Sequence, residues 1–445
     1  MLEALKETIL DYQEFVVGAD AGVPRKLAVE PRPGKASICI GVRRAGKSTL
    51  MLQKIKKLLA GGVPRENILH VNFFDDRLRG LATPGLVLEA YFSLYPEKKN
   101  AETVHCFFNE IQMLGGWEAF ADRAMRTEKC EVYVTGSSAR MLSKEIGTQM
   151  RGRALSRELF PFSFEEYLAY RKIAAGGSMT TKKRLLVRKA FEEYRECEGF
   201  PEVLGLLGDD SRVRVKIHQE YYGALLFRDI VDRYDVSHPR ALADLSRRLV
   251  DNIAAAYSLN GLYNYLKSLG HKISKHNVGD YLAWMEDAYF LFSVRLYDAS
   301  ISRSLVNPKK VYCVDHALAS SVSSGILANT GHLLENIVFA ELRRRCEEIF
   351  YYRTLSGREV DFIFRDESNG REPVLVQVCE SLADPKTRKR ELSALDEAMF
   401  EVGAKQGFVV TQGEEETIGS ERGTIQIVPA WKFLSVSVGY GEGGC

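Results

Sequence analysis

A glycine- and lysine-containing loop at residues 41–48 limits the possible folds of this chain more than any other feature. The loop reads Gly-Val-Arg-Arg-Ala-Gly-Lys-Ser and matches the pattern G-x-x-x-x-G-K-[ST] of phosphate-binding loops. That pattern is informative only between a strand and the start of a helix. Here the apolar run 36–40 precedes the loop, and residues with helical spacing follow it at 48–55. The flanks therefore predict a strand, a loop and a helix that hold phosphates at a positive helix end.

Each residue type in the loop has a chemical reason to be there. Backbone N–H groups wrap the phosphates, Lys47 reaches the outer phosphates, and Ser48 offers its hydroxyl to Mg²⁺. The sequence therefore predicts that the chain binds ATP together with Mg²⁺. The predicted nucleotide-binding residues are Gly41, Arg43, Arg44, Ala45, Gly46, Lys47, Ser48 and Thr49.

Length and composition limit the class of protein. A chain of 445 residues is too long for one hydrophobic core, so two or three domains are expected. The eight cysteines include no C-x-x-C pair, which favours reduced thiols over a disulfide framework or a zinc site. No apolar run approaches the ~20 residues that span a bilayer, and the N-terminus does not resemble a signal peptide. A cytoplasmic protein without membrane contact is expected.

Strand-like and helical segments alternate from residue 20 to 172, which predicts an α/β domain with a parallel sheet between helices. One strand ends in Asn109-Glu110, where P-loop ATPases place an Asp that holds Mg²⁺ and a Glu that activates water. We expect Glu110 to be the catalytic base. Asn109 keeps an acceptor oxygen without the charge that favours Mg²⁺, so slow turnover is expected; a non-catalytic polar strand end is the alternative. The predicted strands are 68–73, 103–108 and 131–135.

Further polar residues follow the last of these strands. Ser137 stands where a side chain could sense the γ-phosphate and orient water, although serine also forms turns. Arg151 and Arg153 are candidates for an arginine that stabilises the transition state, in cis or from a neighbouring copy in a homo-oligomer. Such arginines also often form structural ion pairs.

Taken together, these segments resemble one family: prokaryotic predicted AAA-type ATPases that carry a C-terminal restriction-endonuclease-like domain of unknown function. The resemblance extends along nearly the whole chain and includes a Gly-Phe-Pro-Glu element at 199–202. It implies an AAA-type ATPase fold and ATP hydrolysis. The family has Asp at the position of Asn109, and this chain departs from it there. The resemblance rests on residues 41–48, 108–112, 116–117, 135–138, 151–153 and 159–164.

The region after the ATPase domain predicts a winged helix-turn-helix. Three helical segments between residues 242 and 282 are followed by strand-like residues 289–297. In DNA readers, the N-terminal residues of the third helix enter the major groove. The same fold also serves as a protein–protein lid, and the sequence favours neither role. The residues placed for DNA contact are Lys272, Ser274, Lys275, His276 and Asn277.

A helix and three strands after residue 330 resemble the restriction-endonuclease-like fold, whose motif is an Asp followed by (Asp/Glu)-x-Lys. Glu335 and Asp361 would hold Mg²⁺, but Gln377 and Cys379 replace the second acid and the lysine. We expect a degenerate nuclease kept for binding or assembly; an active metal-dependent nuclease is the alternative. Lys386 or Lys389 could replace the missing lysine in space, and the basic run to which they belong favours DNA modestly.

The leading hypothesis is an AAA-type ATPase that acts on or with DNA. A nucleotide-gated switch or scaffold with little hydrolysis is the second reading. The expected parts are an N-terminal helix 1–19, an ATPase domain 20–172, a helical and winged-helix region 173–300, a restriction-endonuclease-like domain 301–438 and a disordered tail 439–445.

Overall fold

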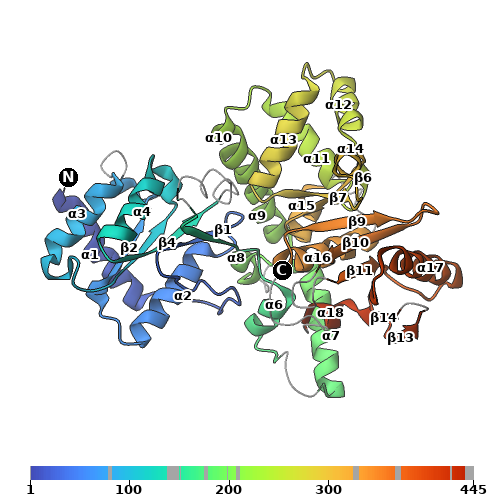
Figure 1. The fold of residues 1–445 in the computed structure, drawn as a ribbon, viewed down its shortest axis with the longest axis horizontal. Coiled ribbons are helices and arrows are strands. Elements are labelled where there is room, and N and C mark those ends of the chain that lie inside the picture. Colours follow the sequence, from blue (N-terminus) through green and yellow to red (C-terminus); the bar gives the residue numbers. More distant parts are fainter. Residues whose placement is uncertain are drawn as a thin grey trace. The chain divides into compact units, whose positions relative to one another are not determined.

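The chain forms two compact units in a computed structural model (Figure 1). The first unit comprises Met1–Phe160 with Asp287–Tyr289, and the second comprises Pro161–Glu286 with Phe290–Cys445. The N-terminal helix thus belongs to the first unit, and the winged-helix and C-terminal regions share the second. The predicted tail 439–445 lies outside the described residues. The structure describes residues 2–78, 83–137, 150, 152–174, 179–197, 199–206, 211–323, 330–365, 372–420 and 423–435.

A five-stranded sheet forms the centre of the first unit, in the order β2-β3-β4-β1-β5. Every neighbouring pair is parallel, which confirms the predicted parallel α/β fold. The apolar run before the glycine loop is the fully buried strand β1. The strands are β1 (Ala36–Ile40), β2 (Ile68–Asn72), β3 (Val104–Asn109), β4 (Cys130–Gly136) and β5 (Ala154–Glu158). The main helices are α1 (Leu2–Gly18), α2 (Lys47–Ala60), α3 (Pro84–Leu94) and α4 (Trp117–Thr127).

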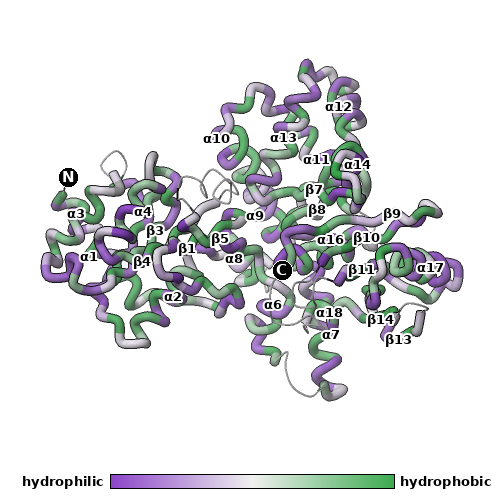
Figure 2. Tube along the Cα trace, in the orientation of Figure 1, coloured by the Kyte–Doolittle hydropathy of each residue, from purple (hydrophilic) through white to green (hydrophobic). Residues whose placement is uncertain are grey.

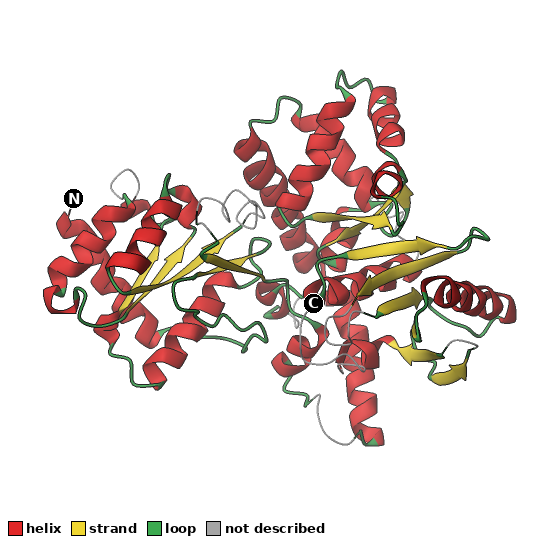
Figure 3. Cartoon of the chain, in the orientation of Figure 1, coloured by secondary structure: helices red, strands yellow, loops and turns green. Residues whose placement is uncertain are grey.

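Helices cover both faces of this sheet (Figure 3). Successive strand residues point to opposite faces, and two neighbours on β3 illustrate this. Phe107 stacks on Tyr133 with ring centroids 4.5 Å apart, in the cluster that contains Ile55 of α2. Phe108 packs instead against Phe120 of α4, with centroids 5.7 Å apart. Polar and apolar residues alternate along the covering helices (Figure 2), which is the pattern of helices packed on one side.

The second unit contains a nine-stranded mixed sheet in the order β13-β14-β12-β11-β10-β9-β7-β8-β6. Helix α17 (Pro385–Val402) packs on it, and its Leu395 and Met399 share a buried cluster with Leu375 and Val409. Helix α16 (Thr330–Arg345) also contacts β8 and β11. The strands are β6 (Ala256–Tyr257), β7 (Leu291–Leu296), β8 (Lys309–Cys313), β9 (Ile349–Arg353), β10 (Glu359–Arg365), β11 (Pro373–Val378), β12 (Gln406–Thr411), β13 (Glu416–Gly419) and β14 (Thr424–Pro429).

The region predicted as a winged helix has its three helices but a different strand arrangement. Helices α11 (Pro239–Val250), α12 (Leu259–Ser268) and α13 (Lys275–Asp287) form as expected. The prediction of several strands within 289–297 is wrong, because that segment forms the single strand β7. β7 pairs with β8, which in turn pairs with β6. The expected boundary at residue 300 therefore separates β7 from its partner strand.

Candidate functional site

The glycine loop follows β1 and leads directly into α2, as the motif requires. Gly41 has φ +149°, and a Cβ there would lie 2.0 Å from the carbonyl oxygen of Leu159. Gly46 has φ +96° and caps α2 in the left-handed conformation. Both glycines are therefore needed for the path of the backbone, since side chains rarely adopt such φ values. The loop places backbone N–H groups at the start of α2, where anions bind favourably.

Lys47 lies inside this loop, with only 6% of its surface exposed. Its Nζ donates hydrogen bonds of 2.9 Å to the carbonyl oxygens of Gly41 and Val42. These two bonds to neutral acceptors fix the position of the ammonium within the loop. Ser48 and Arg44 are exposed on the same loop.

Arg25, which sequence reasoning missed, stabilises the glycine loop through hydrogen bonds to its backbone and to the residues after β5. Its guanidinium donates to the carbonyl oxygens of Ala45 and Phe160, at 2.6 Å each. Its own N–H donates to the side chain of Gln53, on α2, at 3.1 Å. One side chain thus ties the loop to the end of β5 and to the helix that follows the loop. No sequence motif marks this arginine, because its partners are backbone atoms far away in the chain.

Asn109 is buried at the end of β3, with both ends of its amide engaged. Its Oδ1 accepts a hydrogen bond of 3.1 Å from the hydroxyl of Thr135, and its Nδ2 lies 3.3 Å from Nε2 of His70. Burial lowers the pKa of His70 to about 4, so the neutral imidazole can accept this bond. The amide that replaces the expected Asp is therefore matched to a neutral partner on β2, which sequence reasoning also missed.

Glu110 follows Asn109 in an unusual backbone conformation, with φ +54°. Non-glycine residues rarely occupy this region, and functional sites are enriched in them. The N–H of Glu110 donates to the hydroxyl of Thr135 at 3.3 Å, and Gln112 donates to its carboxylate at 2.6 Å. Thr135 thus links both residues, whereas the predicted sensor Ser137 is buried just beyond the end of β4. Because all five strands are parallel, these residues share the glycine loop's edge of the sheet.

Arg153 lies at the opposite edge of the same sheet. Its carbonyl oxygen accepts a hydrogen bond of 2.8 Å from the N–H of Ala36, at the start of β1. The glycine loop begins at the other end of that strand, about 13 Å away at the usual rise per residue. Its guanidinium forms an ion pair of 2.7 Å with Asp122 on α4. A role in cis on the nucleotide does not fit this position, and Arg151 lies outside the described residues.

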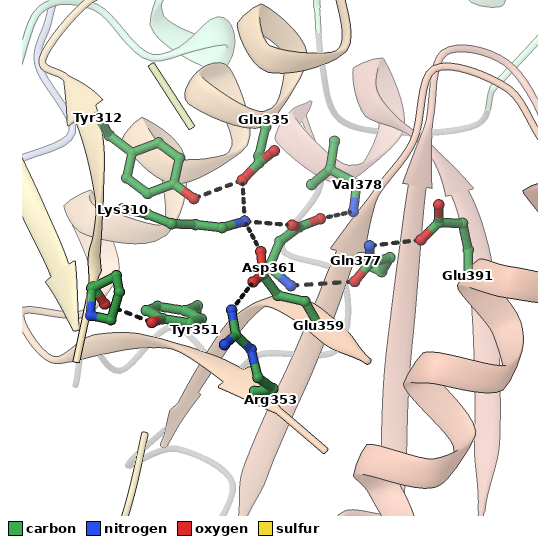
Figure 4. Close-up of polar contacts among 11 residues, drawn as sticks. Lys310, Tyr312, Glu335, Tyr351, Arg353, Glu359, Asp361, Gln377, Val378 and Glu391 are labelled. Atoms are coloured by element: carbon green, nitrogen blue, oxygen red, sulfur yellow. Dashed lines mark hydrogen bonds and ion pairs between the residues drawn. The ribbon is translucent and has the colours of Figure 1, made fainter. Parts of the chain in front are cut away.

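The residues expected from the resemblance to hold Mg²⁺, Glu335 and Asp361, come together in the second unit, around a lysine that the sequence did not indicate (Figure 4). Lys310 Nζ lies 2.8 Å from Asp361, 3.1 Å from Glu335 and 3.0 Å from Glu359. The hydroxyl of Tyr312 donates to Glu335 at 2.7 Å. Burial and the neighbouring Asp361 raise the pKa of Glu335 to about 8, against the opposing effect of Lys310. Burial disfavours the charge of Lys310, but Asp361 and the other acids nevertheless hold its pKa well above the ordinary value.

Gln377 joins this group through hydrogen bonds and not through a charge. Its Oε1 accepts from the N–H of Asp361 at 3.2 Å, and its Nε2 donates to Glu391 of α17 at 2.8 Å. The second oxygen of Asp361 accepts from the N–H of Val378 at 2.9 Å. Cys379 lies apart from these contacts, with its Sγ 3.1 Å from the carbonyl oxygen of Ser381. Lys310, and neither Lys386 nor Lys389, is the lysine seen in ion pairs with Glu335 and Asp361.

The N-terminus of α13 presents part of the predicted DNA-contact set. Lys272, Lys275 and His276 are exposed. Ser274 and Asn277 cap the helix instead, because each backbone N–H bonds the other's side-chain oxygen, at 2.9 and 3.2 Å.

The described residues contain neither an evident metal cluster nor a membrane-spanning helix. No group of three or more His, Cys, Asp or Glu side chains there is arranged to hold a metal ion. No helix in the described part is long and apolar enough to cross a membrane.

The parallel sheet and the glycine loop define the first unit as a P-loop ATPase domain of the AAA class. Residues 33–168 match a family model described as an AAA domain. Residues 188–329 match the Domain of unknown function (DUF8612), and residues 330–433 match the Domain of unknown function (DUF4143).

Relatives match along most of the chain. It is 31% identical over 443 residues to the uncharacterized protein MJ1544 of Methanocaldococcus jannaschii, covering 96% of this chain and 94% of that protein. The chain therefore belongs to the same family as MJ1544. An uncharacterized protein of Haemophilus influenzae is 29% identical over 327 residues, covering 73% and 78% of the two chains.

Solved structures are similar at lower identity. The Walker-type ATPase PABY2304 of Pyrococcus abyssi is 14% identical with a TM-score of 0.42, covering 69% of this chain and 99% of that one. The ORC1 protein of Aeropyrum pernix, solved in complex with DNA, is 14% identical with a TM-score of 0.32, covering 74% and 94%.

Proposed function

We propose that this protein binds ATP with Mg²⁺ at the glycine loop and hydrolyses it slowly. The observation that carries the proposal is the geometry of the loop, in which Lys47 is buried at the start of α2. The residues fit Mg²⁺, since the exposed hydroxyl of Ser48 can hold it together with phosphate oxygens. The backbone of the loop and the side chains of Arg43, Arg44 and Thr49 would contact the nucleotide.

Glu110 is the proposed general base, at the loop's edge of the sheet. The bond from Gln112 orients its carboxylate. Asn109 would offer the metal an uncharged oxygen that already accepts a hydrogen bond from Thr135. Weak metal retention, and hence slow turnover, follows from this missing charge. Ser137 is proposed to sense the γ-phosphate from the neighbouring strand end.

The direct test measures nucleotide binding and turnover on the same variants. We expect Lys47→Ala to abolish binding of a fluorescent ATP analogue, and Glu110→Gln to bind it normally while hydrolysis falls by about 10²–10⁴-fold, the usual share of a general base. Glu118→Gln, on the half-buried start of α4, is the matched control and should behave as the parent. Absence of triphosphate binding in the parent would refute the proposal.

A nucleotide-gated switch is the second candidate, and the amide of Asn109 is the observation that favours it. Asn109→Asp separates the two, because it restores the charge that Mg²⁺ prefers. We expect turnover to rise at least tenfold. Unchanged and negligible turnover in both proteins, with normal ATP binding, would favour the switch.

We further propose that the second unit contacts DNA through the N-terminus of α13. The three helices with β6, β8 and β7 are compatible with a winged helix, and Lys272, Lys275 and His276 are exposed. Replacing all three by Ala should weaken DNA binding and reduce the salt dependence of log K by about two, one for each lysine–phosphate contact. Arg240→Ala, on the neighbouring helix, is the control. Unaltered DNA affinity in the triple variant would favour a protein-binding lid.

The C-terminal part is proposed to be a restriction-endonuclease-like domain that has lost cleavage. Glu335, Asp361 and Gln377 meet as the fold would require, but an amide and a thiol stand in place of the acid and the lysine. We expect no plasmid nicking with Mg²⁺ or Mn²⁺. Nicking that disappears in Asp361→Ala would instead establish an active nuclease.

Arg153 is proposed to act on a nucleotide held by a neighbouring copy. Arg153 lies too far from the glycine loop of its own chain to act there, so a role in trans is the one that remains. Turnover per molecule that rises with protein concentration, and no longer does so in Arg153→Ala, would support a homo-oligomer of this kind.

A further inference from the structure

The side chain of Lys310 is enclosed by acids to a degree that ordinary surface ion pairs do not reach. Only 4% of the side chain is exposed, and three carboxylates lie within 3.1 Å of its Nζ. An ammonium has three N–H donors and no acceptor. One donor can therefore go to each of Glu335, Glu359 and Asp361, from α16 and β10 (Figure 4).

The carboxylates themselves need a cation at this point. Buried charges are costly unless they are paired and hydrogen-bonded. Neutral donors satisfy some of the oxygens, namely the hydroxyl of Tyr312 and the N–H of Val378. Arg353 pairs with Glu359 from the other side, at 3.2 Å. Asp361 and Glu335 are left with Lys310 as their shared positive partner in the described contacts.

We propose that Lys310 is the resident cation of this site, and that its ammonium occupies the point at which a divalent metal would otherwise bind. A Mg²⁺ or Mn²⁺ ion would need these oxygens at about 2.0–2.2 Å, whereas they surround nitrogen at 2.8–3.1 Å. The ion and the ammonium cannot share the position. The wild-type site therefore takes no divalent metal, in agreement with the lack of any group of three or more His, Cys, Asp or Glu side chains arranged for one among the described residues. Removal of the amine would let the three carboxylates move together around an ion and so create a metal site. This inference is independent of ATP turnover.

Mn²⁺ binding to the nucleotide-free full chain tests the proposal, with free Mn²⁺ counted by electron paramagnetic resonance. We expect Lys310→Ala to bind one Mn²⁺ per chain more than the parent. Lys310→Ala/Asp361→Asn should lose that ion again. Lys309→Ala is the matched control, because the neighbouring strand residue points to the opposite face, and it should bind as the parent does.

A folded Lys310→Ala that gains no ion would overturn the proposal. So would a Mn²⁺ ion in the parent that disappears in Asp361→Asn. If Lys310→Ala melts at a lower temperature, Mn²⁺ should raise its melting temperature while leaving that of the parent unchanged. If Lys310→Ala does not fold at any Mn²⁺ concentration, the comparison of the parent with Asp361→Asn decides: equal Mn²⁺ binding supports the proposal, and weaker binding in Asp361→Asn refutes it.

Discussion

Two buried lysines, one in each unit, differ in the charge of their partners. Lys47 donates to two neutral carbonyl oxygens of its own loop, whereas Lys310 is surrounded by three carboxylates from a helix and a strand. An ammonium is attracted more strongly by the full negative charge of a carboxylate or phosphate than by the dipole of a neutral carbonyl group. A phosphate can therefore displace the partners of Lys47 but cannot compete for Lys310. Lys47 can therefore exchange its partners for a ligand, whereas Lys310 stabilises the folded structure.

The sharpest test replaces each lysine by the uncharged, similarly long methionine. We expect Lys310→Met to lose about 3–5 kcal/mol of unfolding free energy, because it leaves buried carboxylates without their cation. Lys47→Met should lose less, about 1–2 kcal/mol, because the carbonyl oxygens of Gly41 and Val42 that it leaves behind are neutral, yet it should abolish ATP binding. Urea denaturation and nucleotide titration measure the two effects. Equal stability losses would contradict the comparison.

His70 tests whether the first unit depends on a neutral buried group where the second depends on charged ones. Burial lowers its pKa to about 4 from an ordinary 6.5. The unfolded chain therefore takes up the proton first, so the contribution of His70 to stability is complete above pH 6.5 and is lost as the pH falls towards 4. The loss at pH 4 should be roughly 3 kcal/mol, at 1.36 kcal/mol per pKa unit. His70→Gln should lack this part of the acid destabilisation in urea curves measured from pH 7 to 4.

Gly41→Ala tests whether the loop that carries Lys47 requires its observed backbone path. The new Cβ would meet the carbonyl oxygen of Leu159. Stability should fall by about 1–3 kcal/mol, and ATP affinity should fall with it. Gly115→Ala is the control, because nothing lies within 4 Å of its Cβ position. Normal ATP affinity in Gly41→Ala would show that the loop adapts.

Arg25→Ala should have the smallest effect. It removes two hydrogen bonds that hold the loop in place, so ATP affinity should weaken about tenfold, or 1.4 kcal/mol. Arg25→Lys keeps the charge with fewer fixed donors and should recover part of the loss. If Arg25→Ala binds ATP as tightly as the parent, the hydrogen bonds of Arg25 are not needed to position the loop.

Local pattern was enough to predict the first unit but not the partners within its site. Strands β1 to β4 lie within a residue or so of their predicted ranges, because each is a short apolar run between turns. Strand β5 was not predicted, and its half-buried residues give no such apolar run. The contact of Asn109 with His70 depends on the pairing of β2 with β3, which no spacing reveals. Arg153 belongs to the segment 151–153, from which a transition-state arginine was predicted. The pairing of β5 with β1 places it instead at the end of the sheet opposite the glycine loop.

The same limit explains what was missed in the second unit. Glu335, Asp361 and Gln377 were selected from the sequence because the resemblance to the restriction-endonuclease-like fold implies polar residues at these positions. Lys310 could be seen only as the basic entry to a strand, 25 residues before Glu335 and 51 before Asp361. Its role follows from the sheet that places β8 beside β7 and β7 beside β9.

The strand β7 has a mechanical consequence. It pairs antiparallel with β8 and parallel with β9, and the N–H of Tyr297 extends the second contact with a bond of 2.8 Å to Tyr351. The helices around α13 and the strand bearing Asp361 are thus joined through one continuous set of main-chain bonds. A bound molecule that rotates α13 must therefore also move β10, the strand that carries Asp361, or break the main-chain hydrogen bonds between β7 and β9.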